Sequence, residues 1–317
     1  MIKNTDRKFI KDLIVGEQVE SYFRIISFTK RLKRDGNPFL TLTFMDKTGQ
    51  IGGKIWESIE QIMNILEEGK IFRINGSINE YQGTKEIKVD SIGLATPDGD
   101  LIKESDFIEE APFDTEKMFS DMIVFMRSRI SSEYILQLIE SFKSKYKEKF
   151  CSHYGAQKIH HAYTGGLLRH TFSVIKVADL LADFYELDKD ILLTGAFFHD
   201  IGKMEEFTVF PSISLTEEGG LEGHIVIGLR IFSKLTSEIK GFPESEAKKI
   251  RHAIISHHGE KDFGSPEVPK TREAFVLHIV DLLDSKLDII NNAIKNSEKR
   301  SDFTDYIPLL GRRLYNE

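Results

Sequence analysis

The sequence predicts a multidomain protein, with an all-β barrel at the N-terminus and an all-α helical bundle, carrying a small β-hairpin insertion, at the C-terminus. Three observations lead to this fold class. Residues 15–95 consist of short runs rich in β-branched and aromatic residues, separated by turn residues. Beyond Thr115, apolar residues recur mainly at helical spacing. All ten histidines lie between His153 and His278, so the two parts also differ in chemistry.

The N-terminal part has the pattern of five strands and one short helix. The strands are expected at 19–29, 39–45, 50–56, 70–81 and 84–92, and the helix at 59–66. Within the second strand, Leu40, Leu42 and Phe44 share one face because strand side chains alternate. A tight hairpin at 82–83 joins the last two strands. Three strands, a helix and two strands is the element order of the OB fold, a barrel that frequently binds single strands of nucleic acid.

A segment rich in proline, glycine and acidic residues follows the barrel. Residues 96–114 therefore predict an extended linker between an OB-fold domain at 1–95 and a helical domain at 115–317, whose metal core spans about 157–290. In the helical domain, Phe119, Ile123, Met126 and Ile130 recur at the spacing of one helix face. The stretch 206–216 is the exception, and it predicts the small β-hairpin.

The bulk composition limits the class of protein. The fractions of 40% hydrophobic and 29% charged residues are those of an ordinary globular protein. A single cysteine, Cys151, excludes an internal disulfide and a cysteine-based metal site, which favours a reducing compartment. The N-terminus lacks the apolar core of a secretory signal, and no apolar run approaches the roughly 20 residues of a membrane span. We therefore expect a cytoplasmic protein without a membrane partner.

The net charge of −7 argues at first against a nucleic-acid partner. The distribution of charge weakens this objection, because residues 1–95 hold 15 Lys and Arg against 13 Asp and Glu. The acidic excess therefore belongs to the helical domain, where we expect most of it on solvated helix surfaces.

The sharpest chemical signal is the segment 198–203, Phe-His-Asp-Ile-Gly-Lys. His199 and Asp200 offer an imidazole and a carboxylate from one point, and the two oxygens of Asp200 can bridge two cations. Lys203 follows at the helical spacing that puts it on the same side. The other candidate ligands stand on separate expected helices: His170, His224, His257, His258 and Asp281. Helices that converge on a core pocket build metal sites in this way, and mixed imidazole and carboxylate ligands suit Mn, Fe, Co, Ni or Zn better than Ca.

The order of these residues resembles the HD superfamily of metal-dependent phosphohydrolases. The surrounding sequence is still more similar to the YhaM-type 3′→5′ exoribonucleases, which couple an OB-fold domain to an HD domain. The matching stretches are 160–170 (His-His-Ala-Tyr-Thr-Gly-Gly-Leu-Leu-Arg-His), 199–203 (His-Asp-Ile-Gly-Lys), 223–228 (Gly-His-Ile-Val-Ile-Gly), 256–259 (Ser-His-His-Gly), 264–266 (Gly-Ser-Pro) and 277–281 (Leu-His-Ile-Val-Asp). Together with the OB-like region, the similarity extends over nearly the whole chain.

The resemblance implies a two-cation site and the reaction that it catalyses. One divalent transition-metal ion, with Mn the first expectation, would be held by His170, His199, Asp200 and Asp281, and a second by Asp200, His224 and His257. Lys203 would contact the phosphate, and the alternative for it is a solvated cation at the helix end. His258 would bind metal, contact phosphate or orient a loop, and His161 would contact substrate or pack beneath the site. The implied activity is hydrolysis of single-stranded RNA from its 3′ end with release of nucleoside 5′-monophosphates, and this polarity rests on the resemblance alone.

In the OB-like region, two groups of residues are candidates for RNA binding. Four basic residues, expected in the loop after the first strand, form one group: Lys30, Arg31, Lys33 and Arg34. The other joins Phe39, Lys54 and Trp56, because an aromatic residue beside cations can stack on bases. The alternatives are a solvated basic loop and a tryptophan that closes the barrel end.

Two other functions share these features. A phosphohydrolase of nucleotides or cyclic dinucleotides would use the same metal core, and a non-catalytic regulatory protein would use the OB-like domain. Single-stranded DNA as an additional substrate, and assembly into a homo-oligomer, are both compatible with the sequence.

Overall fold

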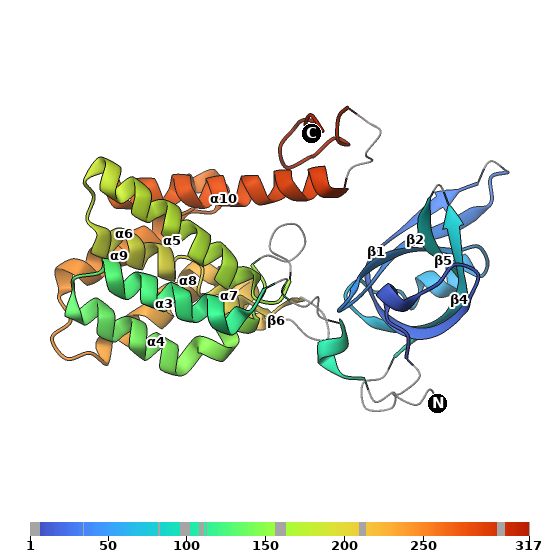
Figure 1. Cartoon of the computed structure of the whole chain (residues 1–317), viewed down its shortest axis with the longest axis horizontal. Coiled ribbons are helices and arrows are strands. Elements are labelled where there is room, and N and C mark those ends of the chain that lie inside the picture. Colours follow the sequence, from blue (N-terminus) through green and yellow to red (C-terminus); the bar gives the residue numbers. More distant parts are fainter. Residues whose placement is uncertain are drawn as a thin grey trace. The chain divides into compact units, whose positions relative to one another are not determined.

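The structure is a computed structural model, and it describes residues 7–33, 35–81, 83–95, 102–107, 111, 113–155, 163–208, 214–296 and 302–316. Residue contacts divide the chain into two units (Figure 1). The first comprises Met1–Glu110 with Thr208–Ser214, and the second comprises Ala111–Phe207 with Leu215–Glu317. Each unit has a buried apolar core of its own.

Five strands of the first unit form a closed barrel with the order β1-β2-β3-β5-β4. They are β1 (Gln18–Leu32), β2 (Pro38–Asp46), β3 (Gly49–Ile55), β4 (Ile71–Tyr81) and β5 (Thr84–Leu94), and helix α1 (Ile59–Met63) stands between β3 and β4. Neighbouring strands pair antiparallel except β3 and β5, which are parallel. The element order predicted for an OB fold is confirmed.

Alternating side chains fill this barrel. Leu40, Leu42 and Phe44 of β2 are buried, whereas Phe39 and Thr41 on the opposite face are partly exposed. The inward face of every strand contributes branched or aromatic residues to one continuous core. The period-two pattern of the sequence is therefore the pattern that closes the barrel.

The first strand is longer than the sequence predicts. It continues beyond 29 to Leu32, because the ladder with β2 runs on until Leu32 pairs with Pro38. Lys30 and Arg31 consequently belong to a strand, where they pair with Leu40 and Phe39. Their expected place in a loop was wrong.

One described part of the predicted linker, residues 104–107, is also not extended. Residues 104–107 form a 3₁₀ turn whose Phe107 is fully buried against Tyr22 and Ile71 of the barrel. Asp106 accepts a hydrogen bond from the Arg7 guanidinium at 3.0 Å. An apolar anchor beside an ion pair holds this turn on the first unit.

The second unit is built from helices, as predicted. They are α3 (Thr115–Arg129), α4 (Glu133–Ser152), α5 (Gly166–Tyr185), α6 (Lys189–Phe198), α7 (Lys203–Glu206), α8 (Glu217–Ser237), α9 (Glu244–Ser256) and α10 (Arg272–Asn296). Asp114, Ser132, Asp188 and Thr216 begin four of them as N-caps, because each side chain accepts a backbone N–H of the first turn. The predicted hairpin is present as β6 (Phe207–Thr208) paired with β7 (Ser214–Leu215). No helix in the described ranges combines the length and hydropathy that a membrane crossing requires.

Helix α6 lies at the centre of the helical core. All of its residues from Ile191 to Phe198 are buried, which is the pattern of a helix surrounded by others. The ring of Phe142 on α4 meets those of Phe150, Phe197 and Phe198 at centroid distances of 5.5, 5.0 and 5.6 Å. This aromatic packing fixes the C-terminal end of α6, which is where His199 and Asp200 follow.

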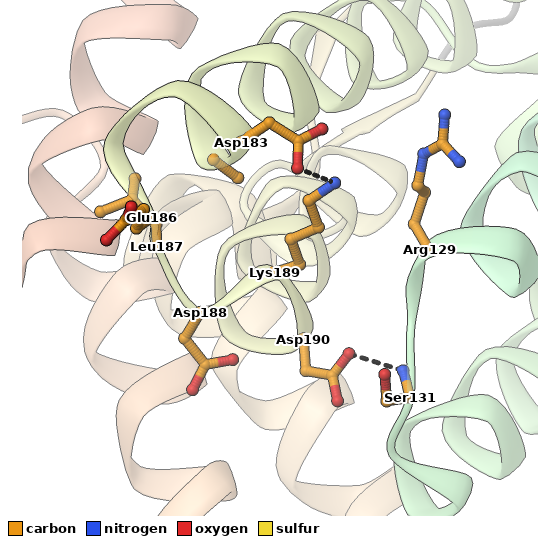
Figure 2. A pocket seen from close by; sticks show the side chains of 9 residues that line it. Arg129, Ser131, Asp183, Glu186, Leu187, Asp188, Lys189 and Asp190 are labelled. Atoms are coloured by element: carbon orange, nitrogen blue, oxygen red, sulfur yellow. Dashed lines mark hydrogen bonds and ion pairs between the residues drawn. The ribbon is translucent and has the colours of Figure 1, made fainter.

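A polar pocket of about 420 Å³ lies where α5 turns into α6 (Figure 2). Lys189 pairs with Asp183 at 2.7 Å and with the buried Asp179 at 3.0 Å. Asp190 accepts the backbone N–H of Ser131 at 2.8 Å, across to the turn between α3 and α4. These ion pairs and this hydrogen bond join α5, α6 and the turn between α3 and α4 at one end of the bundle.

Candidate metal centre

Five helices deliver histidine and aspartate side chains to one point in the second unit. His170 lies in the second turn of α5, and His199 with Asp200 ends α6. His224 lies in α8, His257 follows α9 as its C-cap, and Asp281 lies in α10. The structure thus brings together all six residues that the sequence groups as metal ligands.

Asp200 is the centre of this arrangement. One carboxylate oxygen, Oδ2, lies 3.4 Å from His199 Nε2 and 3.5 Å from His170 Nε2. The other oxygen, Oδ1, lies 3.5 Å from His224 Nε2 and 3.6 Å from His257 Nε2. Each oxygen therefore faces its own pair of imidazoles, and the carboxylate stands between two groups of nitrogen donors.

The opposite nitrogen of every imidazole is held by an acceptor. His199 Nδ1 lies 2.7 Å from the Ala196 carbonyl, and His257 Nδ1 lies 2.7 Å from the Ile254 carbonyl. A carbonyl oxygen only accepts, so these Nδ1 atoms carry the protons and the Nε2 lone pairs face Asp200. Such hydrogen bonds fix the tautomer and the ring plane of histidines that bind metal.

Carboxylates hold the remaining two imidazoles. His170 Nδ1 lies 2.7 Å from Asp284 Oδ2, and His224 Nδ1 lies 3.2 Å from Glu206 Oε2. Glu206 Oε1 also accepts the backbone N–H of His224 at 3.0 Å. A carboxylate behind an imidazole raises the basicity of its free nitrogen.

The donors form two clusters with metal-ligand spacing among the described residues. One consists of His170, His199 and Asp281, and the other of His224, His257 and His258, with ligand atoms in each within 4.8 Å of one another. The Nε2 atoms of His224 and His257 are buried and have no hydrogen-bond partner. Buried nitrogens without partners are costly unless a cation or proton occupies the space between them, so these residues fit divalent ions.

Charges in the centre favour ionised carboxylates. Burial opposes ionisation of Asp200, but the Lys203 ammonium at 2.5 Å and the nearby imidazoles hold the pKa of Asp200 well below its usual range. Burial likewise opposes ionisation of Asp281, but the hydrogen bond from His170 and the charges of His199 and His170 together outweigh it and lower the pKa of Asp281. Burial alone would lower the pKa of His170, yet hydrogen bonds to Asp281 and Asp284 raise it to about 10.

Histidines of the second cluster behave differently. Burial lowers the pKa of His257 and outweighs the attraction of the Asp200 carboxylate, whose Oδ1 lies 3.6 Å from His257 Nε2. Burial is the main cause that lowers the pKa of His258, and repulsion from His257 lowers it further. Both rings are therefore neutral near pH 7, which is the state in which an imidazole can bind a cation.

Two glycines allow α8 to present His224. Gly223 has φ +72° and interrupts the helix, which lets the backbone N–H of His224 reach Glu206. Gly202 packs directly against α8, and a Cβ atom there would lie 1.9 Å from the His224 carbonyl oxygen. The close approach of these two segments sets the distance between Asp200 and His224.

The other sequence candidates of the helical unit lie around the centre. Lys203 donates to Asp200, and His258 Nδ1 donates to the Phe263 carbonyl at 3.0 Å. Both line a cavity of about 240 Å³ together with Asp200 and Asp281. His161 lies outside the described residues.

In the barrel unit, Phe39 and Trp56 stack with centroids 4.8 Å apart and an interplanar angle of 15°. Lys33 Nζ lies 5.0 Å from the centroid of the Trp56 ring. Lys30 pairs with Glu60, and Lys54 pairs with Glu86, so neither is an isolated cation. The structure therefore brings Phe39, Trp56 and Lys33 together, whereas Arg34 lies outside the described residues.

Two residues of the site escape sequence reasoning. Glu206 is the last residue of α7, six residues beyond Asp200. In the sequence it is simply an acidic residue one helical turn after Lys203, which gives no indication of a role in the site. Phe263 lines the metal cavity from the loop that follows His258. No pattern in the sequence pairs either residue with a ligand.

Comparisons with known proteins find the same two domains in this chain. The family model described as "HD domain" matches residues 167–286, and the one described as "OB-fold nucleic acid binding domain" matches residues 24–95. The 3′-5′ exoribonuclease YhaM of Geobacillus sp. (strain WCH70) is 35% identical over 302 residues, which are 95% of this chain and 92% of the relative. The proteins of the same name from Bacillus licheniformis and Bacillus subtilis (strain 168) are 33% and 32% identical, each over 95% of both chains. Identity of this extent, across a barrel and a helical unit that carries the His/Asp centre, shows that the chain belongs to the YhaM family of 3′-5′ exoribonucleases.

Proposed function

We propose that this protein is a metal-dependent 3′→5′ exoribonuclease that hydrolyses single-stranded RNA and releases nucleoside 5′-monophosphates. The observation that carries the proposal is the convergence of four histidine Nε2 atoms on the two oxygens of Asp200. A carboxylate placed between two sets of nitrogen donors is suited to a pair of divalent cations. Membership of the YhaM family supports the polarity and the RNA substrate.

In this proposal, each half of the centre holds one cation. His170, His199 and Asp281 serve one half, His224 and His257 serve the other, and Asp200 belongs to both. The proposed ions are divalent transition metals, with Mn the first candidate and Co, Fe, Ni and Zn the alternatives, because mixed imidazole and carboxylate ligands suit this class of ion. His258 lies beside the second half and is a further candidate ligand there.

Bound cations of this kind supply activated water and neutralise charge on the phosphate. Lys203 adds a positive charge next to them. Burial would lower the pKa of its ammonium group, but the attraction of the Asp200 carboxylate outweighs burial and raises that pKa. Its ammonium would orient a non-bridging phosphate oxygen and stabilise the charge that develops there. His258, whose Nδ1 proton is held by the Phe263 carbonyl, presents an unprotonated Nε2 as a proton acceptor or a ligand.

The barrel unit would hold the RNA strand. The stacked pair of Phe39 and Trp56, with Lys33 over the indole, combines an aromatic surface with a positive charge. Bases of any sequence can stack on such a surface. We propose that the OB-fold domain at 1–95 thereby raises the local concentration of RNA for the helical domain at 115–317, in the cytoplasm.

The test uses RNA labelled at either end. Full-length protein is incubated with 5′-labelled and 3′-labelled single-stranded RNA across several divalent metals, with single-stranded DNA in parallel. The expected result is progressive shortening of the 5′-labelled strand and immediate release of labelled mononucleotide from the 3′-labelled strand. Asp200→Asn should abolish hydrolysis and keep RNA binding. Cleavage in the interior of the strand, or activity that survives Asp200→Asn, would contradict the proposal.

A further inference from the structure

An exposed aromatic side chain, Phe263, lines the cavity beside the metal centre. Phe263 and Leu282 are the apolar residues of its lining, and the polar ones are Asp200, Lys203, His258, His278, Asp281 and Ser285. The Phe263 ring is 64% exposed, although it lies beside fully or largely buried metal-site residues. Leu282, the residue after Asp281 on α10, is 39% exposed.

The backbone that carries this ring is held by hydrogen bonds. Residues Lys261–Phe263 form a 3₁₀ turn in which the Phe263 N–H donates to the Glu260 carbonyl at 3.0 Å. The Gly264 N–H closes the same turn on the Lys261 carbonyl at 2.9 Å. The Phe263 carbonyl in turn accepts from His258 Nδ1 at 3.0 Å. The loop that carries the ring is thus hydrogen-bonded to a residue of the centre itself.

The ring has no structural role that explains its place. It belongs to none of the buried apolar cores, and within the described part of the chain it stacks on no other aromatic ring. An exposed ring contributes little to folding through burial. An exposed aromatic ring on a hydrogen-bonded turn, next to a phosphate site, is instead the arrangement of a surface for stacking.

We propose that Phe263, together with Leu282 of the same cavity lining, forms a subsite for the base of the nucleotide being released. This inference rests on the proposed function, because it assumes that the phosphate of that nucleotide lies at Asp200 and Lys203. The base of the 3′-terminal nucleotide stacks on the Phe263 ring and excludes water from the cavity. Every base has a stacking face, so the subsite binds all four nucleotides and favours a terminal nucleotide that carries a base.

The kinetic test compares terminal nucleotides with and without a base. Steady-state trimming is measured on RNA that ends in adenosine and on the same RNA that ends in an abasic ribose. Stacking of one base on one aromatic ring corresponds to about 5- to 150-fold in affinity. We expect Phe263→Ala to lower kcat/KM on the adenosine end by a factor in this range and to leave the abasic end unchanged, while Phe263→Trp keeps both values.

A matched control and a binding measurement complete the test. Phe184 on α5 is 77% exposed and does not line the cavity, so Phe184→Ala should change neither substrate. Calorimetric titration with AMP and with ribose 5-phosphate, both in Mn²⁺, should show a preference for AMP in the wild type that disappears in Phe263→Ala.

Three outcomes would overturn the subsite. They are an equal loss on adenosine and abasic ends, no loss on either end, and the same preference for AMP in the wild type and in Phe263→Ala. Failure of the proposed function is a different result, namely a wild-type protein that does not shorten RNA in any metal. In that case the calorimetric comparison of AMP with ribose 5-phosphate still tests whether Phe263 binds a base, because this measurement needs no turnover.

Discussion

Replacing Glu206 by glutamine should weaken one cation site of the centre and leave the other intact. The Glu206 carboxylate accepts both the backbone N–H and the Nδ1–H of His224, at 3.0 and 3.2 Å. Glutamine keeps the size of the side chain but removes the negative charge and one acceptor oxygen. His224 would then lose both its fixed tautomer and part of the basicity of Nε2.

The magnitude follows from what a carboxylate behind a metal-binding histidine contributes. Loss of such a partner lowers metal affinity by roughly 10- to 100-fold, which is about 1.4 to 2.7 kcal/mol. The matched change is Asp284→Asn, because Asp284 holds His170 Nδ1 at 2.7 Å in the other half of the centre. We therefore expect each variant to weaken a different one of two binding events.

Isothermal titration of the metal-free protein with Mn²⁺ measures both events directly. The double variant should weaken both, and melting curves in EDTA should show that each variant still folds. If Glu206→Gln leaves both affinities unchanged, or if both single variants weaken the same event, then these carboxylates do not position separate halves of one site.

Four further outcomes are expected. Gly202→Ala should destabilise the protein by about 1–3 kcal/mol in urea unfolding, because the new Cβ meets the His224 carbonyl oxygen. Burial raises the pKa of Cys151 to about 12, so a thiol reagent at pH 8 should react only after denaturation. Since the pKa of His170 is about 10 without metal, Mn²⁺ binding at pH 7.5 should release a proton, detectable as heat that varies with the buffer. Trp56→Ala should weaken binding of long RNA by about 5- to 150-fold and spare hydrolysis of a dinucleotide. Equal losses on both substrates would exclude the barrel face as the RNA site.

The sequence could predict what local patterns encode. Alternation in β2 identified the inward residues Leu40, Leu42 and Phe44, and the ordered His/Asp blocks identified the side chains that meet at Asp200. Those features depend on period and order along the chain, which are visible without coordinates. The metal and substrate roles of the grouped residues stay predictions.

What the sequence could not predict depends on contacts between distant segments. Lys30 and Arg31 lie in β1 because its pairing with β2 continues to Leu32. The basic composition of this segment gives no indication of that pairing. Phe107 is buried because the barrel offers it an apolar recess, although the surrounding residues have the composition of a linker. Glu206 acquires its role only when the break at Gly223 turns the His224 N–H toward it.

The placement of Asp200 between imidazoles from four helices has a consequence for the lifetime of the protein in the cell. Cations bound there would act as cross-links among α5, α6, α8 and α9, which are spread over residues 166–256. A ligand that binds only the folded state stabilises it by about 2.7 kcal/mol at a hundred times its Kd. Loss of the metal would then lower the stability of the helical unit as well as its activity, and would make the chain more susceptible to proteolysis.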